Sequence, residues 1–480
     1  MPDPWASLAA FYLDDSLSDC NIVFVPKQQV QGSGSGTGTN KGKKRKHSGE
    51  GEQLPVLETM PGHRIVLAAC SPYFQALFVR WKQGSDQQVT VEYDGPDDLA
   101  AAKACIKTLY LQTPPSNEDL STDAGSVFPL LLKMIDWADL WQAPTCTELC
   151  ISSLVAQRLD SLCPEHINSM LVQLPESLRS TPLNSKVEGF CLRWLLYTFG
   201  DMWVTVTTEA KRAAFCNLCP AAVELWMGSD QLAGVENEVA VLVTLWHAGQ
   251  QGQAASDASL RHLSELLRVK NLAPSTRVDP LLGLPWFQHN AALKKLIVLA
   301  GSGWCLAEVA SEDQIEFPPA WFAEPRCGTL RSVSPPLASR CQHVWRISTA
   351  DFAALINKAK TTTRYQELAS STIFCKGAFF KGALVLRHGN EEGELYLGLS
   401  FRTAGDSAYP RPIIQRVKYS MGFEEQGERV TLAKQAAFFD QEGWIEYAKS
   451  FAAELIDWEE GVQQPADGFF TFFFIVHMVE

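Results

Sequence analysis

The chain has 480 residues, a formal net charge of −13 and a pI near 5.3. One hydrophobic core does not support that length, so we expect two to four domains. Hydrophobic residues make up 46% and charged residues 20%, which is typical of folded globular protein. The acidic balance excludes a surface that wraps nucleic acid or an anionic membrane along its length, and we expect neither as a direct partner.

The sequence predicts neither a signal peptide nor a disulfide framework, which indicates a reducing compartment. The first thirteen residues lack a basic segment followed by a long apolar one, and no apolar stretch reaches the roughly 18 residues of a membrane helix. Thirteen scattered cysteines, an odd number, are typical of reduced thiols rather than of a disulfide framework. We therefore expect the protein in the nucleus and the cytoplasm.

The first region mixes strand and helix patterns. Asn21–Val25 is a short β run, and Ser71-Pro72 is typical of an N-cap followed by proline at the first helical position. The apolar stripe of that predicted helix comprises Phe74, Leu77, Phe78 and Trp81. A half-buried strand is then predicted by alternation at Val89, Val91 and Tyr93, and helical spacing returns at Leu99, Ala102, Ile106 and Leu109.

A segment of different composition, residues 27–55, interrupts this region. Its Gly/Ser/Thr run predicts a flexible, disordered insert. A compact basic cluster follows, made of Lys41, Lys43, Lys44, Arg45 and Lys46. Clustered cations on a flexible loop suit an acidic nuclear import receptor, and a solvated loop is the alternative interpretation.

From Leu130 to about Pro285 the helical period dominates and predicts an all-α array. Its apolar stripes are Leu130, Met134, Trp137 and Trp141; Val187, Cys191 and Trp194; Val239, Leu242, Val243 and Trp246; and Leu260, Leu263 and Leu267. Prolines between Pro318 and Ser339 then predict a linker.

Beyond the linker the period changes to two. Alternation on both sides of the Gly389–Gly393 turn predicts a hairpin, with Leu384 and Leu386 on its first strand. Val417, Tyr419 and Met421 make another strand face. The terminal run from Gly468 to Val479 is apolar on both faces, as in a central strand.

Three stretches resemble known families. Ser18–Phe24 together with Gly62–Phe78 resembles the BTB/POZ signature, with the basic insert standing where that family has a tight hairpin. Leu218–Trp226, Glu238–Trp246 and Leu266–Leu272 are similar to the BACK domain that follows many BTB domains.

The third resemblance lies near the C-terminus. His343–Ile347, Phe374 to Leu386, Leu395–Leu397 and Gly443–Ile445 resemble a MATH (TRAF-like) sandwich. As a whole, the chain also resembles plant light-response BTB-BACK proteins, whose members likewise end in a β-rich region.

These resemblances imply a multi-domain fold. The expected parts are an α/β BTB/POZ domain at 1–155 with the insert at 27–55, an all-α BACK domain at 156–305, a linker at 306–340, and a mostly-β MATH/TRAF-like sandwich at 341–480.

The resemblance implies a substrate adaptor of a cullin-3 ubiquitin ligase, homodimeric through its BTB domain and binding protein targets through its C-terminal sandwich. The implied cullin contact comprises Phe78, Trp81, Lys82 and Gln83. Gln83 stands where the family has glutamate, which removes a charge but keeps the side-chain length. Trp81 also continues the helix stripe, so packing in the core is its alternative role.

Other implied sites lie at both ends of the chain. Asp19 and Arg64 match a charged pocket near the BTB dimer interface, where we expect a structural role. Tyr419 and Trp444 fall near positions that line the peptide groove of MATH domains, and packing within the sandwich is their alternative role.

Catalytic signals are weak, and we expect no enzyme, cofactor or metal. The glycine run lacks the Gly-Lys-Ser/Thr of a phosphate loop, and no nucleophile elbow or zinc-protease helix occurs. Cys216-x-x-Cys219 has metal-ligand spacing but lacks a second pair, and Cys146 and Cys150 are expected to be packed thiols. A nuclear scaffold that binds no cullin, and a metal or redox enzyme using Cys216 and Cys219, remain as alternatives.

Overall fold

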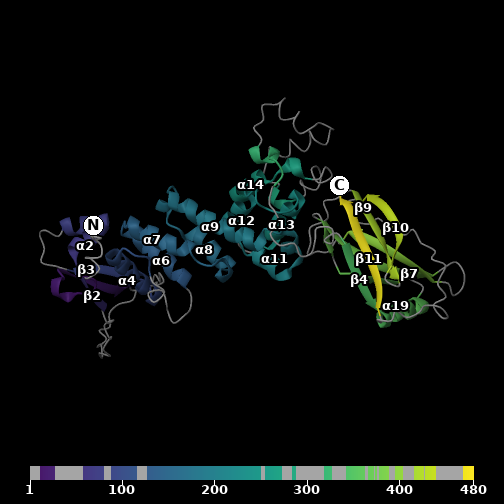
Figure 1. Cartoon of the computed structure of the whole chain (residues 1–480), viewed down its shortest axis with the longest axis horizontal. Coiled ribbons are helices and arrows are strands. Elements are labelled where there is room, and N and C mark those ends of the chain that lie inside the picture. The colour runs from purple at the N-terminus through teal and green to yellow at the C-terminus, as the bar shows by residue number, and fades with distance from the viewer. Residues whose placement is uncertain are drawn as a thin grey trace, which may run out of the picture. The chain divides into compact units, whose positions relative to one another are not determined.

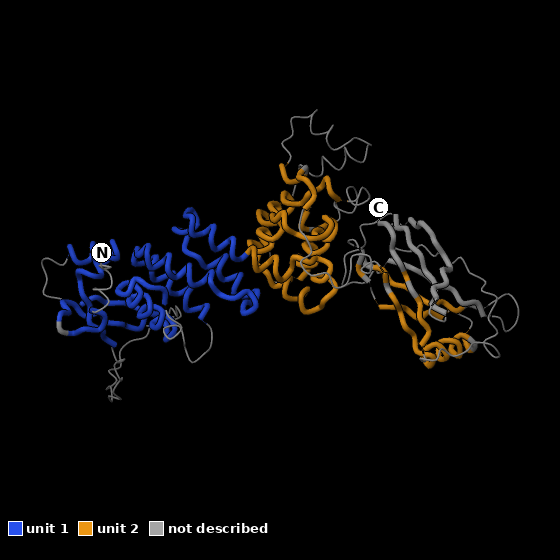
Figure 2. Tube along the Cα trace, in the orientation of Figure 1, with its two compact units in different colours: residues 1–191 blue, residues 192–480 orange. Residues whose placement is uncertain are grey.

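The computed structural model divides into two compact units, residues 1–191 and 192–480 (Figure 2). The described residues are 11–27, 58–80, 88–115, 127–249, 255–272, 284–287, 318–326, 342–362, 366–371, 373–375, 378–388, 395–403, 416–425, 428–438 and 469–479. The division falls inside one continuous helix, α9 (Pro182–Phe199).

In the described part of the first unit, the short 3-10 helix η1 (Asp15–Leu17) precedes a three-stranded sheet of order β2-β1-β3, whose strands β2 and β3 are labelled in Figure 1. Strand β1 (Cys20–Pro26) pairs antiparallel with β2 (Glu58–Gly62) and parallel with β3 (Gln88–Tyr93). Its residues Ile22, Val23 and Phe24 are all buried, as expected for a central strand with both faces covered. The β run predicted at Asn21–Val25 and the alternating strand at Val89–Tyr93 are confirmed.

The other regular elements described in the first unit are helices. They are α2 (Arg64–Cys70), α3 (Pro72–Arg80), α4 (Pro96–Leu111), α6 (Val127–Leu140), α7 (Pro144–Val155), η3 (Leu159–Ser161), α8 (Pro164–Gln173) and η4 (Glu176–Leu178). The first stripe predicted for the helical region, from Leu130 to Trp141, is buried on α6 and the residue after it. Its tryptophans, Trp137 and Trp141, lie with ring centroids 5.0 Å apart.

The second unit opens with an all-α region, as predicted. After α9 come α10 (Met202–Thr207), α11 (Glu209–Cys216), α12 (Pro220–Met227), α13 (Glu236–Gly249), α14 (Asp257–Leu266), η5 (Val269–Asn271) and η7 (Pro285–Phe287). Edge-to-face contacts join Phe199 to Phe215 at 5.4 Å and Phe215 to Trp226 at 4.9 Å. The indole of Trp246 donates to the carbonyl oxygen of Leu218 at 2.8 Å, so this buried polar atom is satisfied.

The C-terminal part contains two four-stranded antiparallel sheets. One has the order β10-β9-β11-β4, and in the other β7 pairs with β5, β6 and β8. The strands are β4 (Gln342–Ser348), β5 (Gln366–Ala369), β6 (Ile373–Cys375), β7 (Ala378–His388), β8 (Leu395–Thr403), β9 (Arg416–Glu425), β10 (Glu428–Phe438) and β11 (Phe469–Val479).

The strand predictions for this region are confirmed. Leu384 of β7 is the register partner of Leu399 of β8, which is the predicted hairpin. Strand β11 lies between β9 and β4, which explains why its sequence is apolar on both faces.

Among the described elements that were not predicted are a helix and a 3-10 turn. Helix α19 (Thr349–Thr361) follows β4, capped by the Ser348 hydroxyl, which accepts from the Asp351 N–H, and its own Phe352 and Leu355 are buried. Inside the region predicted as a linker, residues 318–326 include the 3-10 helix η8 (Pro319–Phe322). In the portion of the chain that the structure describes, no helix combines the length and apolar character needed to cross a membrane.

Candidate functional site

The α2–α3 pair of the first unit is fixed by the serine between the two helices. The buried Ser71 hydroxyl donates to the carbonyl oxygen of Trp141 and accepts from the N–H of Phe74 at 3.2 Å. The Phe74 ring packs against Trp141 at 5.4 Å. Helix α3 is thus held in one orientation by Trp141, the residue that follows α6. This also fixes the position of the exposed face of α3.

Phe78 lies on the inner face of α3. Only 6% of the residue is exposed, its ring stacks on Phe74 at 6.2 Å, and the Arg64 guanidinium lies 5.1 Å from the ring centroid. The Arg64 guanidinium also donates to the Phe78 carbonyl oxygen at 3.3 Å. Phe78 therefore packs in the core and offers little surface to a partner, while Trp81, Lys82 and Gln83 lie outside the described residues.

Asp19 and Arg64 lie together, as the resemblance implied, but their contact is made by the backbone. A carboxylate oxygen of the exposed Asp19 accepts from the Arg64 N–H at 2.7 Å. That N–H opens helix α2, where the N-cap residue His63 makes no side-chain cap. Asp19 is thus an acceptor for the helix N-terminus, and the pair is not a buried ion pair.

Large apolar side chains remain exposed around these helices. Ile65 on α2 is 78% exposed and Leu17 is 60% exposed, and both adjoin or lie near the Asp19–Arg64 contact. Tyr73 and Leu140, the neighbours of the packed Phe74 and Trp141, are 39% and 58% exposed, and Val79 of α3 is also exposed. Apolar side chains of this kind mark a protein-binding surface where they form a contiguous patch, so these positions are candidate contact residues.

Sequence reasoning missed these surface positions. A seven-residue helix such as α2 has too few turns for its pattern to separate the exposed Ile65 from the buried Val66 and Leu67. Helical spacing selected Phe78 and passed over Tyr73 and Val79, because it identifies the face of a helix that packs and not the residues that remain exposed.

The cysteines with metal-like spacing lie on separate elements. Cys216 ends α11 and donates to the Leu245 carbonyl oxygen at 3.5 Å, and Cys219 is the N-cap of α12. Burial raises the pKa of both thiols. Within the described ranges, no three or more His, Cys, Asp or Glu side chains gather as a metal site would require.

Three other cysteines lie in the core of the first unit. The sulfurs of Cys105 on α4 and Cys146 on α7 are 3.4 Å apart, and Cys150 lies one turn further along α7. Burial raises the pKa of Cys105, and hydrogen bonding with Cys105 raises that of Cys146. Thiols held protonated in this way are poor nucleophiles, which agrees with the predicted packing role.

The remaining predicted sites are placed only in part. Tyr419 lies on β9, with its Cα opposite Gln435 of β10 and Val476 of β11. Trp444 and the basic cluster at residues 41–46 lie outside the described residues.

Comparison with known proteins identifies a domain family within the first unit. A BTB/POZ domain model matches residues 56–157, which include β2, α2, α3, β3, α4, α6 and α7. Kelch-like protein 38 of Mus musculus is 25% identical over 307 residues, or 63% of this chain and 43% of the relative. Kelch-like protein 38 of Rattus norvegicus is 27% identical over 216 residues, or 44% of this chain and 31% of the relative.

The matched regions span less than half the length of these relatives. The sheet order β2-β1-β3 adds β1 to the matched part, because β1 is the central strand between two strands that the family model includes. The first unit therefore contains a BTB/POZ domain.

Proposed function

We propose that the chain is a non-enzymatic substrate adaptor of a cullin-3 ubiquitin ligase, present in the nucleus and the cytoplasm. Its BTB domain would form a homodimer and bind cullin-3, and its C-terminal sheets would bind the target protein. The similarity to Kelch-like protein 38 supports this, because it covers 307 residues and so extends well beyond the BTB match at 56–157.

The observation that carries the proposal is the set of exposed apolar side chains on a BTB domain whose core is already filled. Tyr73, Val79 and Leu140 would meet cullin-3 around the outward side of α3 and the end of α6. Leu17 and Ile65 would meet the second copy around the start of α2. A dimer would present two target sites and so raise avidity for a multivalent target.

The test is a pull-down of the purified cullin-3 N-terminal region by the full chain. The Tyr73→Ala/Leu140→Ala double variant should lose at least about tenfold in affinity, because truncating anchor side chains removes most of the binding energy of an interface. Trp81→Ala tests the position implied by the family resemblance. Val172→Ala, which changes an exposed apolar residue on α8, is the matched control and should bind as the wild type does.

A nuclear BTB scaffold or transcriptional co-regulator that binds no cullin is the second candidate. Gln83 favours it, because it stands where the family places a glutamate, and the basic cluster at residues 41–46 suits import into the nucleus. A dimeric wild type that fails to bind cullin-3 at micromolar concentrations would replace the ligase adaptor with this scaffold.

A further inference from the structure

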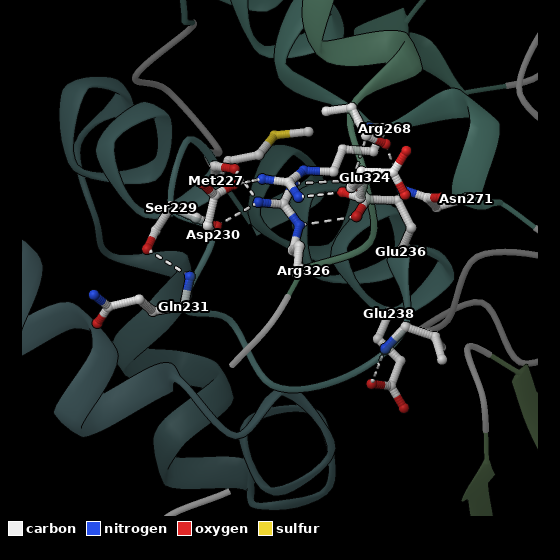
Figure 3. A network of polar contacts seen from close by, with 12 residues as sticks. Met227, Ser229, Asp230, Gln231, Glu236, Glu238, Arg268, Asn271, Glu324 and Arg326 are labelled. Atoms are coloured by element: carbon white, nitrogen blue, oxygen red, sulfur yellow. Dashed lines mark hydrogen bonds and ion pairs between the residues drawn. The ribbon is translucent and has the colours of Figure 1, made fainter. Parts of the chain in front are cut away.

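Residues 318–326, here called the docking segment, are held against the helical part of the second unit by a network of polar contacts (Figure 3). The only regular structure of the docking segment itself among the described residues is the 3-10 turn η8. Its partners lie on or beside α12, α13, α14 and η5, and the contacts join residues 52 to 99 positions apart. The docking segment thus packs against helices that are distant from it in the sequence.

Arg326 is one anchor of the docking segment. Its guanidinium donates to Glu236 through Nε to Oε2 at 2.8 Å and through Nη2 to Oε1 at 3.0 Å. Nη1 donates to the carbonyl oxygens of Met227 and Ser229, each at 2.6 Å. Both charged side chains are only 2% exposed. The planar fork of arginine fits this arrangement, and the single ammonium of lysine does not.

Glu236 is prepared for this role by its own surroundings. It is the first residue of α13, where the helix N-terminus favours a negative charge. Its Oε1 also accepts from the backbone N–H of Arg268 at 2.8 Å. The carboxylate is therefore oriented by the helices, independently of the docking segment.

Trp321 is the other anchor. It is buried, and its indole N–H donates to the carbonyl oxygen of Ser264 on α14 at 2.9 Å. Between the anchors, Arg268 donates to the Glu324 carbonyl oxygen at 2.5 Å and Asn271 to that of Ala323 at 3.0 Å. The helical region thus binds two side chains of the docking segment and donates hydrogen bonds to the backbone carbonyl oxygens between them.

Two buried anchor side chains, with hydrogen bonds to the backbone between them, are also how a protein binds a peptide. A buried ion pair adds little net stability compared with apolar packing, but it strongly disfavours a wrong partner, because an unpaired buried charge is costly. Tryptophan and arginine are also the residue types that most often anchor protein interfaces.

We propose that α12, α13, α14 and η5 form a peptide-binding site for a tryptophan and an arginine separated by four residues. The docking segment occupies this site in cis, and a partner protein with the same spacing binds by displacing it. The inference does not depend on cullin binding.

Binding of a fluorescein-labelled peptide of residues 318–326 to the full chain tests the site. The Trp321→Ala/Arg326→Ala variant, whose own segment lacks both anchors, should bind the peptide at least about tenfold more tightly than the wild type, where the tethered segment competes at high effective concentration. Adding Glu236→Gln should abolish that binding, and a peptide with lysine at the arginine position should bind more weakly.

Arg158→Ala is the matched control. Arg158 of the first unit pairs with Asp160 at 2.6 Å, and both side chains are exposed and lie outside the proposed site, so its loss should leave the peptide affinity unchanged. A double variant with wild-type circular dichroism that fails to bind the peptide would overturn the proposal.

If the double variant does not fold, hydrogen exchange of the wild type tests whether the docking segment opens separately from the helices. Backbone amides of residues 318–326 should exchange through a local opening, faster than those of α13 and with a weaker dependence on urea. Exchange of both regions at the same rate and with the same urea dependence would make the docking segment an integral part of the core and refute the peptide site.

Discussion

The residue type at position 382 is determined by a side chain from another sheet. Gly382 lies on β7, and a Cβ added there would come within 2.2 Å of the Phe474 ring of β11. Phe474 is itself buried. The absence of a side chain at Gly382 is therefore what lets the aromatic ring fit between the two sheets.

Gly382→Ala should destabilise the chain by about 1–3 kcal/mol, because overpacking forces the ring or the backbone to move. Urea denaturation measures the loss. Gly189→Ala is the control: no atom lies within 4 Å of its added Cβ on α9, so that change should stabilise by roughly 0.5–1 kcal/mol. Combining Gly382→Ala with Phe474→Leu should cost less than the sum of the two single changes, and strict additivity would contradict this account.

Asp136 on α6 makes stability depend on pH. Asp136 is exposed, but desolvation of its carboxyl by the surrounding protein, followed by the charges of Asp139 and Asp98, raises its pKa to about 6 from 3.8. The folded chain therefore holds this proton after the unfolded chain has released it, and stability falls as pH rises from about 4 to about 6.

Asp136→Asn should remove that fall and make the protein more stable than the wild type at pH 7. Thermal unfolding between pH 4 and pH 7 measures it. Asp139→Asn should remove only part of the slope, because the charge of Asp139 is the second cause of the shift. An unchanged slope in Asp136→Asn would assign the pH dependence to other groups.

At the scale of elements, helix α2 depends on a residue from outside the helix. It has seven residues, and Asp19, which precedes strand β1, supplies an acceptor at its N-terminus. A helix this short is not stable alone, so its capping and packing decide whether it forms.

Asp19→Ala should cost about 1 kcal/mol of folding stability, as loss of a helix cap typically does, and Asp19→Asn should be nearly neutral. Asp15→Ala on η1 removes the same charge from a neighbouring exposed position and serves as the control. If Asp19→Asn were as damaging as Asp19→Ala, the charge rather than the hydrogen bond would be what matters.

At the scale of the whole molecule, the proposed homodimer depends on apolar surface near α2. Ile65→Lys should give a light-scattering mass near 53.1 kDa, where the wild type should give about twice that value, because a charge buried against a second copy is costly. Val172→Lys makes the same change on exposed α8 and should remain dimeric. A monomeric wild type would remove dimerisation from the proposed function.

The sequence by itself determined the elements whose pattern is local. Alternation marked β3 and the β7–β8 hairpin, and the helical period marked the buried stripe from Leu130 to Trp141, because side-chain periodicity follows directly from backbone geometry. The motif around Ser71-Pro72 also identified the BTB/POZ domain that the family comparison supports.

Only the tertiary structure decided which surfaces remain free and which distant segments meet. It placed Phe78 in the core, left Ile65 exposed, and joined Arg326 to Glu236 across ninety positions of the chain. A proline-rich segment between two regions looks like a linker, since nothing in its own pattern reports a partner so far away. Long-range pairing is set by the balance of burial and desolvation among residues remote in sequence, and local periodicity carries no record of that balance.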